Sequence, residues 1–292
     1  ANLDSSLEKM FALCRIKSIS TDPAYKDECA RAASWLSDYL VSLGFTSSVR
    51  PTPGHPMVVA HHEGATPDAP HVLFYGHYDV QPADPLGLWT SPPFEPVVAE
   101  GPRGPRIVAR GAVDDKGQTM TWLEAFRAYH AAGGLPLRVT VLVEGEEEIG
   151  SPSLAAFLAA NREELKADAV VISDTGMWDA ATPAITTRLR GSTYVEIGLQ
   201  VGARDLHSGL FGGSAQNAAN VLTRILGALH DADGRVQVPG FYEGVEDVSP
   251  ELLASWNALA FDEAAFLGRM GLATPSGEKN RTALERLWAR PT

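Results

Sequence analysis

The sequence has few cysteines, no long apolar run and no excess of basic residues. Cys14 and Cys29 are too few and too isolated for a disulfide framework or a thiolate metal site, so we expect two ordinary buried thiols. No apolar stretch approaches the roughly 20 residues that span a bilayer. The first residues, ANLDSSLEK, carry acids where a secretory signal carries bases. These features favour a cytoplasmic location.

The charge balance is acidic. Lys and Arg number 24 against 36 Asp and Glu, which gives a net charge of −12. This sign argues against nucleic acid or an anionic membrane surface as a partner. A length of 292 residues allows one large domain or two ordinary ones, and the hydrophobic content of 45% is that of a folded globular protein.

The first half of the chain alternates between predicted strands and predicted helices. Three nearly continuous apolar runs are typical of strands covered on both faces, and they span residues 71–76, 138–143 and 167–173. Helical spacing of apolar residues occupies 26–43, where Gly44 ends it, as well as 114–134 and 151–165. The alternation predicts an α/β fold with a mostly parallel sheet flanked by helices.

The pattern changes near residue 188. Residues 192–201 alternate in the manner of a half-buried antiparallel strand, a glycine-rich turn follows, and a helix is predicted over 215–230. Residues 249–271 have the pattern of two short helices. We therefore expect one domain over 1–187 and a second over 188–292.

Acidic residues follow the predicted strands at their carboxyl ends. Taken singly, each has an ordinary explanation as a helix cap, a turn residue or part of a solvated face. In open α/β sheets, however, these strand ends share one crevice, where several carboxylates are unfavourable unless cations neutralise them. The residues that follow strands are Asp79, Glu147, Glu148 and Asp174, and Asp114, which opens the helix predicted over 114–134, is expected in the same crevice. With His77 beside them, they favour zinc or another first-row divalent ion over magnesium or calcium.

Five motifs resemble those of the dinuclear zinc metallopeptidases of the aminoacylase and glutamate carboxypeptidase type, and most nearly the cytosolic nonspecific dipeptidase and carnosinase branch. They are GHYDVQP (76–82), RGAVDDKGQ (110–118), EGEEEIGS (144–151), VVISD (170–174) and RDLHSGLFGG (204–213). The resemblance implies that 1–187 is the N-terminal part of a catalytic domain. It implies that 188–292 is the first part of an inserted α+β lid and dimerisation domain, so that both domains are incomplete.

The resemblance also implies the metal ligands. It makes His77 a zinc ligand and Asp114 the carboxylate that bridges two zinc ions. Glu148 would bind one of those ions, and Asp174 would bind the other together with His77. Manganese or cobalt could replace zinc.

The remaining roles also come from the resemblance. Asp79 would orient the imidazole of the histidine ligand. Glu147 would be the general base that takes a proton from a metal-bound water and delivers it to the departing amine. We expect an extended backbone to let Glu147 and Glu148 diverge. His207 would stabilise the oxyanion in the neighbouring subunit of a homodimer, and a cis peptide bond would follow Asp114.

The chain departs from the pattern near its end. The resembling proteins continue further and supply a last histidine to the second zinc, but none of the eight histidines here lies late enough to match it. By the resemblance, the site of His77, Asp114 and Asp174 would be complete, whereas the one built on Asp114 and Glu148 would lack a partner. We therefore expect a truncated or nicked product of a longer dipeptidase, weakly active or inactive alone.

Three functions stay open on the sequence alone. The leading one is zinc-dependent hydrolysis of the amide bond of dipeptides. A deacylase of N-acyl amino acids or N-succinyl diamino acids shares every motif, because the bond cleaved is the same. A non-catalytic metal-binding or dimerising fragment is the alternative from another class.

Overall fold

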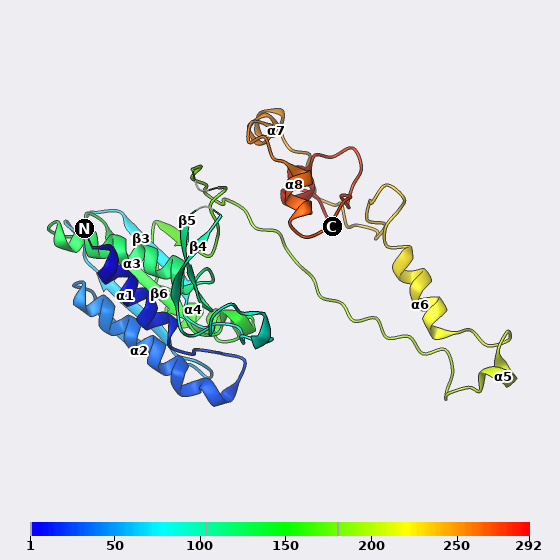
Figure 1. The fold of residues 1–292 in the computed structure, drawn as a ribbon, viewed down its shortest axis with the longest axis horizontal. Helices are drawn as coiled ribbons and strands as arrows, with labels where there is room; N and C mark the ends of the chain where they lie inside the picture. Colours follow the sequence, from blue (N-terminus) through cyan, green and yellow to red (C-terminus); the bar gives the residue numbers. More distant parts are fainter. Residues whose placement is uncertain (1, 103, 180) are drawn as a thin grey trace. The chain divides into compact units, whose positions relative to one another are not determined.

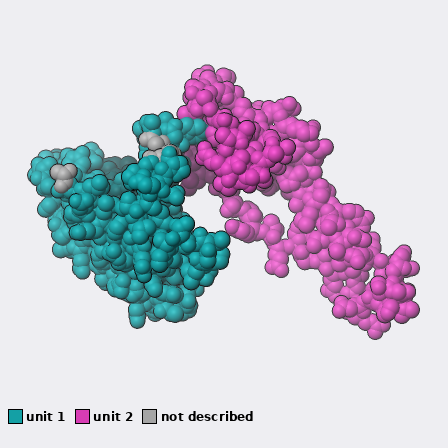
Figure 2. All heavy atoms as spheres, viewed as in Figure 1, with its two compact units in different colours: residues 1–186 teal, residues 187–292 magenta. Residues whose placement is uncertain are grey.

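The computed structural model describes residues 2–102, 104–179 and 181–292. The chain divides into two compact units, Ala1–Thr186 and Thr187–Thr292, which Figure 2 shows in separate colours. Within the described residues, no helix combines the length and the apolar character needed to cross a membrane. Each unit has its own set of elements and is described by itself.

Unit 1 is built on a five-stranded sheet. The strand order is β1-β2-β6-β3-β7, with bounds Thr46–Arg50, Met57–His62, Arg138–Glu144, His71–His77 and Ala169–Ile172. β3 pairs in parallel with both β6 and β7, whereas β2 runs antiparallel to β1 and β6. Four of the five strands therefore point the same way. The predicted α/β class with a mainly parallel sheet is confirmed.

Helices cover both faces of this sheet (Figure 1). α1 (Leu3–Cys14), α2 (Lys26–Ser42) and α3 (Lys116–Ala131) lie on one face, where apolar residues of β2 and β6 such as Val58, Val141 and Val143 join their core. On the other face, α4 (Leu154–Ala160) packs with Met57, Val59 and Leu142. The alternation of Val141, Leu142 and Val143 between the two cores follows from the two-residue period of a strand.

The predicted helices of unit 1 are present. α2 ends where the sequence expects it, because Gly44 adopts a φ of +88° that other residues rarely reach. Cys14 and Cys29 are both buried free thiols, as expected. A β-hairpin of β4 (Val97–Gly101) and β5 (Gly104–Val108) is an element that the sequence patterns did not predict.

The third predicted strand exists but is not buried. β7 lies at the edge of the sheet, where it pairs only with β3 among the described residues. All four of its residues are exposed, and Val170 retains 59% of its accessible surface. The apolar run correctly predicted a strand, whereas the prediction that both its faces are covered is wrong for this unit.

Unit 2 contains five short helices, with bounds Ser208–Phe211 (α5), Ala218–Gly227 (α6), Pro250–Asn257 (α7), Glu263–Gly268 (α8) and Ala283–Trp288 (α9). Side-chain caps begin several of them: Asn217 accepts from main-chain N–H groups of α6, and Ser249 does so for α7. The helices that the sequence predicts over 215–230 and 249–271 are thus confirmed.

The strand predicted over residues 192–201 is wrong. This segment has no regular secondary structure, and Tyr194 and Val195 are 98% and 81% exposed. A strand needs a hydrogen-bonded neighbour, and no described strand pairs with this segment. Alternating polarity by itself does not supply one.

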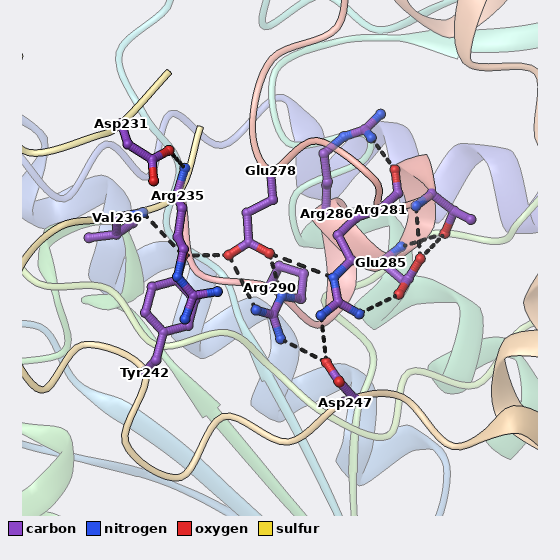
Figure 3. Close-up of polar contacts among 11 residues, drawn as sticks. Asp231, Arg235, Val236, Tyr242, Asp247, Glu278, Arg281, Glu285, Arg286 and Arg290 are labelled. Carbon is purple, nitrogen blue, oxygen red and sulfur yellow. Dashed lines mark hydrogen bonds and ion pairs between the residues drawn. The ribbon is translucent and has the colours of Figure 1, made fainter. Parts of the chain in front are cut away.

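Ion pairs hold the last part of unit 2 together (Figure 3). The guanidinium of Arg290 donates to both carboxylate oxygens of Glu278, at 2.7 and 3.2 Å, and both side chains are buried. The hydroxyl of Tyr242 donates to the same carboxylate. Asp247 accepts from Arg281 at 2.7 Å and from Arg290 at 3.3 Å. These contacts join segments that lie up to 48 positions apart in the sequence, from Tyr242 to Arg290.

Candidate metal centre

The candidate site lies at the carboxyl ends of β3, β6 and β7, which share one edge of the sheet. His77 is the last residue of β3, directly opposite Glu144 at the end of β6. The imidazole of His77 is fully buried, and its Nε2 lies 3.0 Å from Oδ1 of Asp114. The same nitrogen lies 3.8 Å from Oδ2 of Asp174 and 4.0 Å from Oε2 of Glu147. Residues that the sequence spreads over almost a hundred positions therefore meet at one atom.

Three of these residues form a group that fits a metal ion. His77, Asp114 and Asp174 each offer one ligand atom, and these atoms lie within 4.8 Å of one another. In the described part of the chain, no other three acidic, histidine or cysteine side chains meet this condition. One imidazole nitrogen with carboxylate oxygens is a donor set that suits zinc. The carboxylates of Asp114 and Asp174 are 55% and 35% exposed, so the group is open to an incoming ion.

The electrostatics of the site call for a cation. Burial lowers the pKa of the His77 imidazole, but the hydrogen bond and charge of Asp79, with the charges of Asp115 and Glu147, outweigh it and raise that pKa to about 10. For Asp174, burial and then the charge of Asp114 raise the pKa of the carboxyl. Negative charge is thus concentrated here beyond what the surroundings neutralise.

Asp79 ties the histidine to the turn after β6. Its Oδ1 lies 3.4 Å from Nδ1 of His77, while its two oxygens accept the main-chain N–H groups of Glu147 and Glu148 at 3.2 and 3.1 Å. Asp79 is itself fully buried, so these contacts are shielded from water. One carboxylate therefore fixes both the ring and the main chain that carries the two glutamates.

Glu147 and Glu148 point to different partners. The two residues begin a short 3₁₀ helix, Glu147–Ile149, so the extended backbone expected here is not present. Glu147 nevertheless approaches His77, whereas Oε2 of Glu148 accepts the side-chain amide of Gln81 at 2.9 Å. Burial raises the pKa of both carboxyls. Glu148 does not belong to the group of three ligand atoms described above.

His207 lies in unit 2, in the loop before α5. Its Nδ1 accepts the main-chain N–H of Gly209 at 3.0 Å, so the ring caps that short helix. The imidazole is exposed, as a histidine that contacts another molecule has to be. The structure does not place His207 relative to the residues of unit 1.

Several supporting residues escaped the sequence patterns. Glu144 is fully buried at the end of β6, where it accepts hydrogen bonds from the hydroxyls of Tyr75 and Ser151. The sequence feature that could have identified Glu144 is an acidic residue at the end of an apolar strand. Asp115 is also fully buried; burial raises its pKa to about 6. The peptide bond between Asp114 and Asp115 is cis, as the resemblance predicts.

Comparisons with known proteins point to one family. The sequence profile of peptidase family M20/M25/M40 matches residues 73–278. The chain is 30% identical over 301 residues to the Cys-Gly metallodipeptidase DUG1 of Candida albicans, covering 98% of this chain and 62% of that protein. It is 30% identical to human beta-Ala-His dipeptidase, covering 94% of this chain and 56% of that protein. The chain therefore spans about three fifths of the length of these relatives.

Solved structures agree with these matches. The M20 family metallo-carboxypeptidase Sso-CP2 from Sulfolobus solfataricus superposes with a TM-score of 0.78 at 29% identity, covering 98% of this chain and 64% of that one. Human carnosine dipeptidase 1 gives a TM-score of 0.75 at 27% identity, covering 99% of this chain and 63% of that one. Both sets of matches extend over nearly the whole chain.

Proposed function

Because the chain belongs to peptidase family M20/M25/M40, we propose that it hydrolyses the amide bond of dipeptides with the help of divalent metal ions. The observation that carries this proposal is the meeting of ligand atoms from His77, Asp114 and Asp174 within 4.8 Å. The printed names of the relatives, a Cys-Gly metallodipeptidase and a beta-Ala-His dipeptidase, support dipeptides as the substrate class.

Zinc is the metal that the donor set favours, with manganese or cobalt as substitutes. His77, Asp114 and Asp174 would hold one ion, and Asp114 with Glu148 would take part in holding a second. When bound, such ions polarise the scissile carbonyl and lower the pKa of water. Carboxylate oxygens of Asp114, Asp174 and Glu147 lie within 4.0 Å of Nε2 of His77, and this concentration of negative charge supports a cation at this position.

Glu147 is the proposed general base. Its carboxylate is 39% exposed and lies 4.0 Å from the His77 imidazole, so it borders the ligand group while it remains accessible to water and substrate. Burial raises the pKa of its carboxyl group, which favours proton uptake relative to an ordinary glutamate. Glu147 would take a proton from the attacking water and later give it to the departing amine. Asp79 would keep the His77 imidazole and the main chain of Glu147 in place during both transfers.

Unit 2 is proposed to be the first part of a lid through which two copies form a homodimer, and unit 1 the N-terminal part of the catalytic domain. His207 would then donate a hydrogen bond to the oxyanion formed in the neighbouring copy. Its exposed imidazole supports this role. A cytoplasmic location stays a prediction of the sequence.

The test is a substrate panel on the purified chain supplied with zinc, manganese or cobalt. The panel contains Cys-Gly, β-Ala-His, N-acetyl amino acids and an N-succinyl diamino acid. The proposal predicts weak, metal-dependent cleavage of the dipeptides by this chain, lowered by about 100-fold or more in Glu147→Gln. Preferential cleavage of the acylated amino acids would assign the chain as a deacylase. Stoichiometric metal binding with no cleavage of any substrate would support the non-catalytic alternative.

A further inference from the structure

Asp115 lies at a position where an acid usually caps a helix, but its side chain contacts the neighbouring strand β3 instead. It stands at the N-cap position of α3, but its side chain makes no capping hydrogen bond to that helix's main chain. Its Oδ2 instead accepts the main-chain N–H of His77 at 3.1 Å and the hydroxyl of Thr119 at 3.2 Å. Asp115 is fully buried, so its carboxylate lies inside the protein between β3 and α3.

The two elements approach each other closely at this carboxylate. A β-carbon added to Gly76 would lie 2.7 Å from Oδ2 of Asp115 and 2.8 Å from Oγ1 of Thr119, closer than β-carbons are found to such atoms. Only glycine at position 76 therefore leaves room for the carboxylate to reach the main chain of β3. Residue 76 precedes His77, so the close approach falls at the end of the strand that carries the ligand.

We propose that Asp115 is a positioning residue that sets the separation between His77 and Asp114. The carboxylate holds the main chain of His77 against the first turn of α3, and Asp114 immediately precedes Asp115. Holding Asp115 against β3 therefore also fixes the main-chain position from which the Asp114 side chain extends. The result is the 3.0 Å contact between Nε2 of His77 and Oδ1 of Asp114. This inference rests on the proposed function, because it treats those two atoms as metal ligands.

The experiment compares two substitutions at Asp115. Asp115→Asn keeps an oxygen that can accept from His77 and Thr119, whereas Asp115→Ala removes it. The metal-free chain is titrated with zinc by calorimetry, and its thermal unfolding is recorded in parallel. We expect the zinc affinity of Asp115→Ala to fall by about 10- to 100-fold, as for other groups that orient metal ligands. Asp115→Asn is expected to stay within about threefold of the unsubstituted chain, a rescue that loss of bulk alone would not produce.

Two further variants separate the possible failures. Asp22→Ala is the matched control, because Asp22 also accepts a main-chain N–H, that of Ala24, but at a helix start outside the ligand group. Its zinc affinity should not change. His77→Ala tests the metal site itself: zinc affinity that survives this change overturns the proposed site. Loss of zinc in His77→Ala together with retention in Asp115→Ala overturns only the positioning role.

Thr119→Val provides the test if Asp115→Ala does not fold. Valine keeps the shape of the side chain but cannot donate to Oδ2 of Asp115, so the carboxylate loses one of its two donors. We expect zinc affinity to fall by about threefold to 10-fold. This is less than the usual loss for removing a whole orienting group, because the other donor, the main-chain N–H of His77, remains. An unchanged zinc affinity in a folded Thr119→Val contradicts the proposal, and so does a loss in Asp115→Asn as large as in Asp115→Ala.

Discussion

Nε2 of His77 lies 3.0 Å from Oδ1 of Asp114, although the two residues are 37 positions apart in the sequence. The contact forms because β3 ends, and α3 begins, at the same edge of the sheet. Carboxylates of Asp174 and Glu147 approach the same nitrogen within 4.0 Å. So much negative charge around one ring nitrogen is stable only with a proton or a metal cation beside it.

Substitution of the two adjacent glutamates should separate catalysis from metal binding. Glu147→Gln removes the proposed base and should lower the rate of dipeptide cleavage by about 100-fold or more, with metal content unchanged. Glu148→Gln should lower the amount of metal bound, measured by elemental analysis of the dialysed protein. Glu163→Gln, an exposed acid in the loop after α4, serves as the control. Normal cleavage by Glu147→Gln would contradict the assigned roles.

Removal of the Asp79 carboxylate should impair both metal binding and catalysis. Asp79 contacts the His77 imidazole and also accepts the main-chain N–H groups of Glu147 and Glu148. Asp79→Ala is therefore expected to lower zinc affinity by about 10-fold or more. It should also lower kcat when the protein is saturated with zinc, because the turn carrying Glu147 loses its anchor. If zinc affinity falls but kcat does not change, Asp79 only orients the His77 imidazole and does not position Glu147.

The pair of Arg50 and Glu164 should make stability depend on pH. Hydrogen bonds from Arg50, at 2.5 and 2.6 Å, lower the pKa of Glu164 to about 2 from the ordinary 4.5. A lowered pKa stabilises the fold above the unfolded-state value, and this contribution is lost as pH falls from about 4.5 to 2. Arg50→Met should therefore flatten the loss of stability between pH 5 and pH 3.

The expected size of this effect is about 0.5 to 1 kcal/mol, because the pair is partly exposed and water screens it. Urea unfolding at a series of pH values measures it. Arg31→Met is the control, since Arg31 pairs with Glu28 on the surface of α2 at 56% exposure. Parallel pH profiles for Arg50→Met and the unsubstituted chain would show that the pair does not contribute.

The buried pair of Arg290 and Glu278 should govern the stability of unit 2. Both side chains are less than 10% exposed, so Arg290→Met leaves a buried carboxylate without its main partner. Such a loss typically costs about 3 kcal/mol or more. Hydrogen exchange of main-chain amides in residues 278–290 should speed up accordingly. Lys279→Met removes a pair that is 63% and 74% exposed and should change exchange little. Equal changes in exchange rate for Arg290→Met and Lys279→Met would contradict a stabilising role for the buried pair.

Much of unit 1 follows from local patterns in the sequence. The apolar runs that became β3 and β6 are long and uninterrupted, and the acids that follow the strands are brought to one edge by the parallel arrangement. β2 was missed because its apolar run, residues 57–60, is short, and β1 was missed because it forms by pairing with β2. That pairing leaves no periodic signal in a strand such as Thr46–Arg50, whose sequence TSSVR is mostly polar.

The buried residues around the candidate metal group were harder to predict than the three residues of the group itself. An acid at the start of a helix is usually a cap, and nothing local distinguishes Asp115 from one. Its carboxylate contacts His77 because Gly76 lets the strand and the helix approach, a relationship between positions 38 and 39 residues apart. The strand predicted at 192–201 failed for the opposite reason, since its local pattern was clear but no described strand pairs with it.

Anomalous diffraction at the zinc absorption edge, from crystals of the chain grown with zinc, tests the metal site most directly. The proposed centre predicts a peak in contact with Nε2 of His77 and with carboxylate oxygens of Asp114 and Asp174, absent from crystals of His77→Ala. A zinc peak at another place, with no zinc in contact with His77, Asp114 or Asp174, would contradict it.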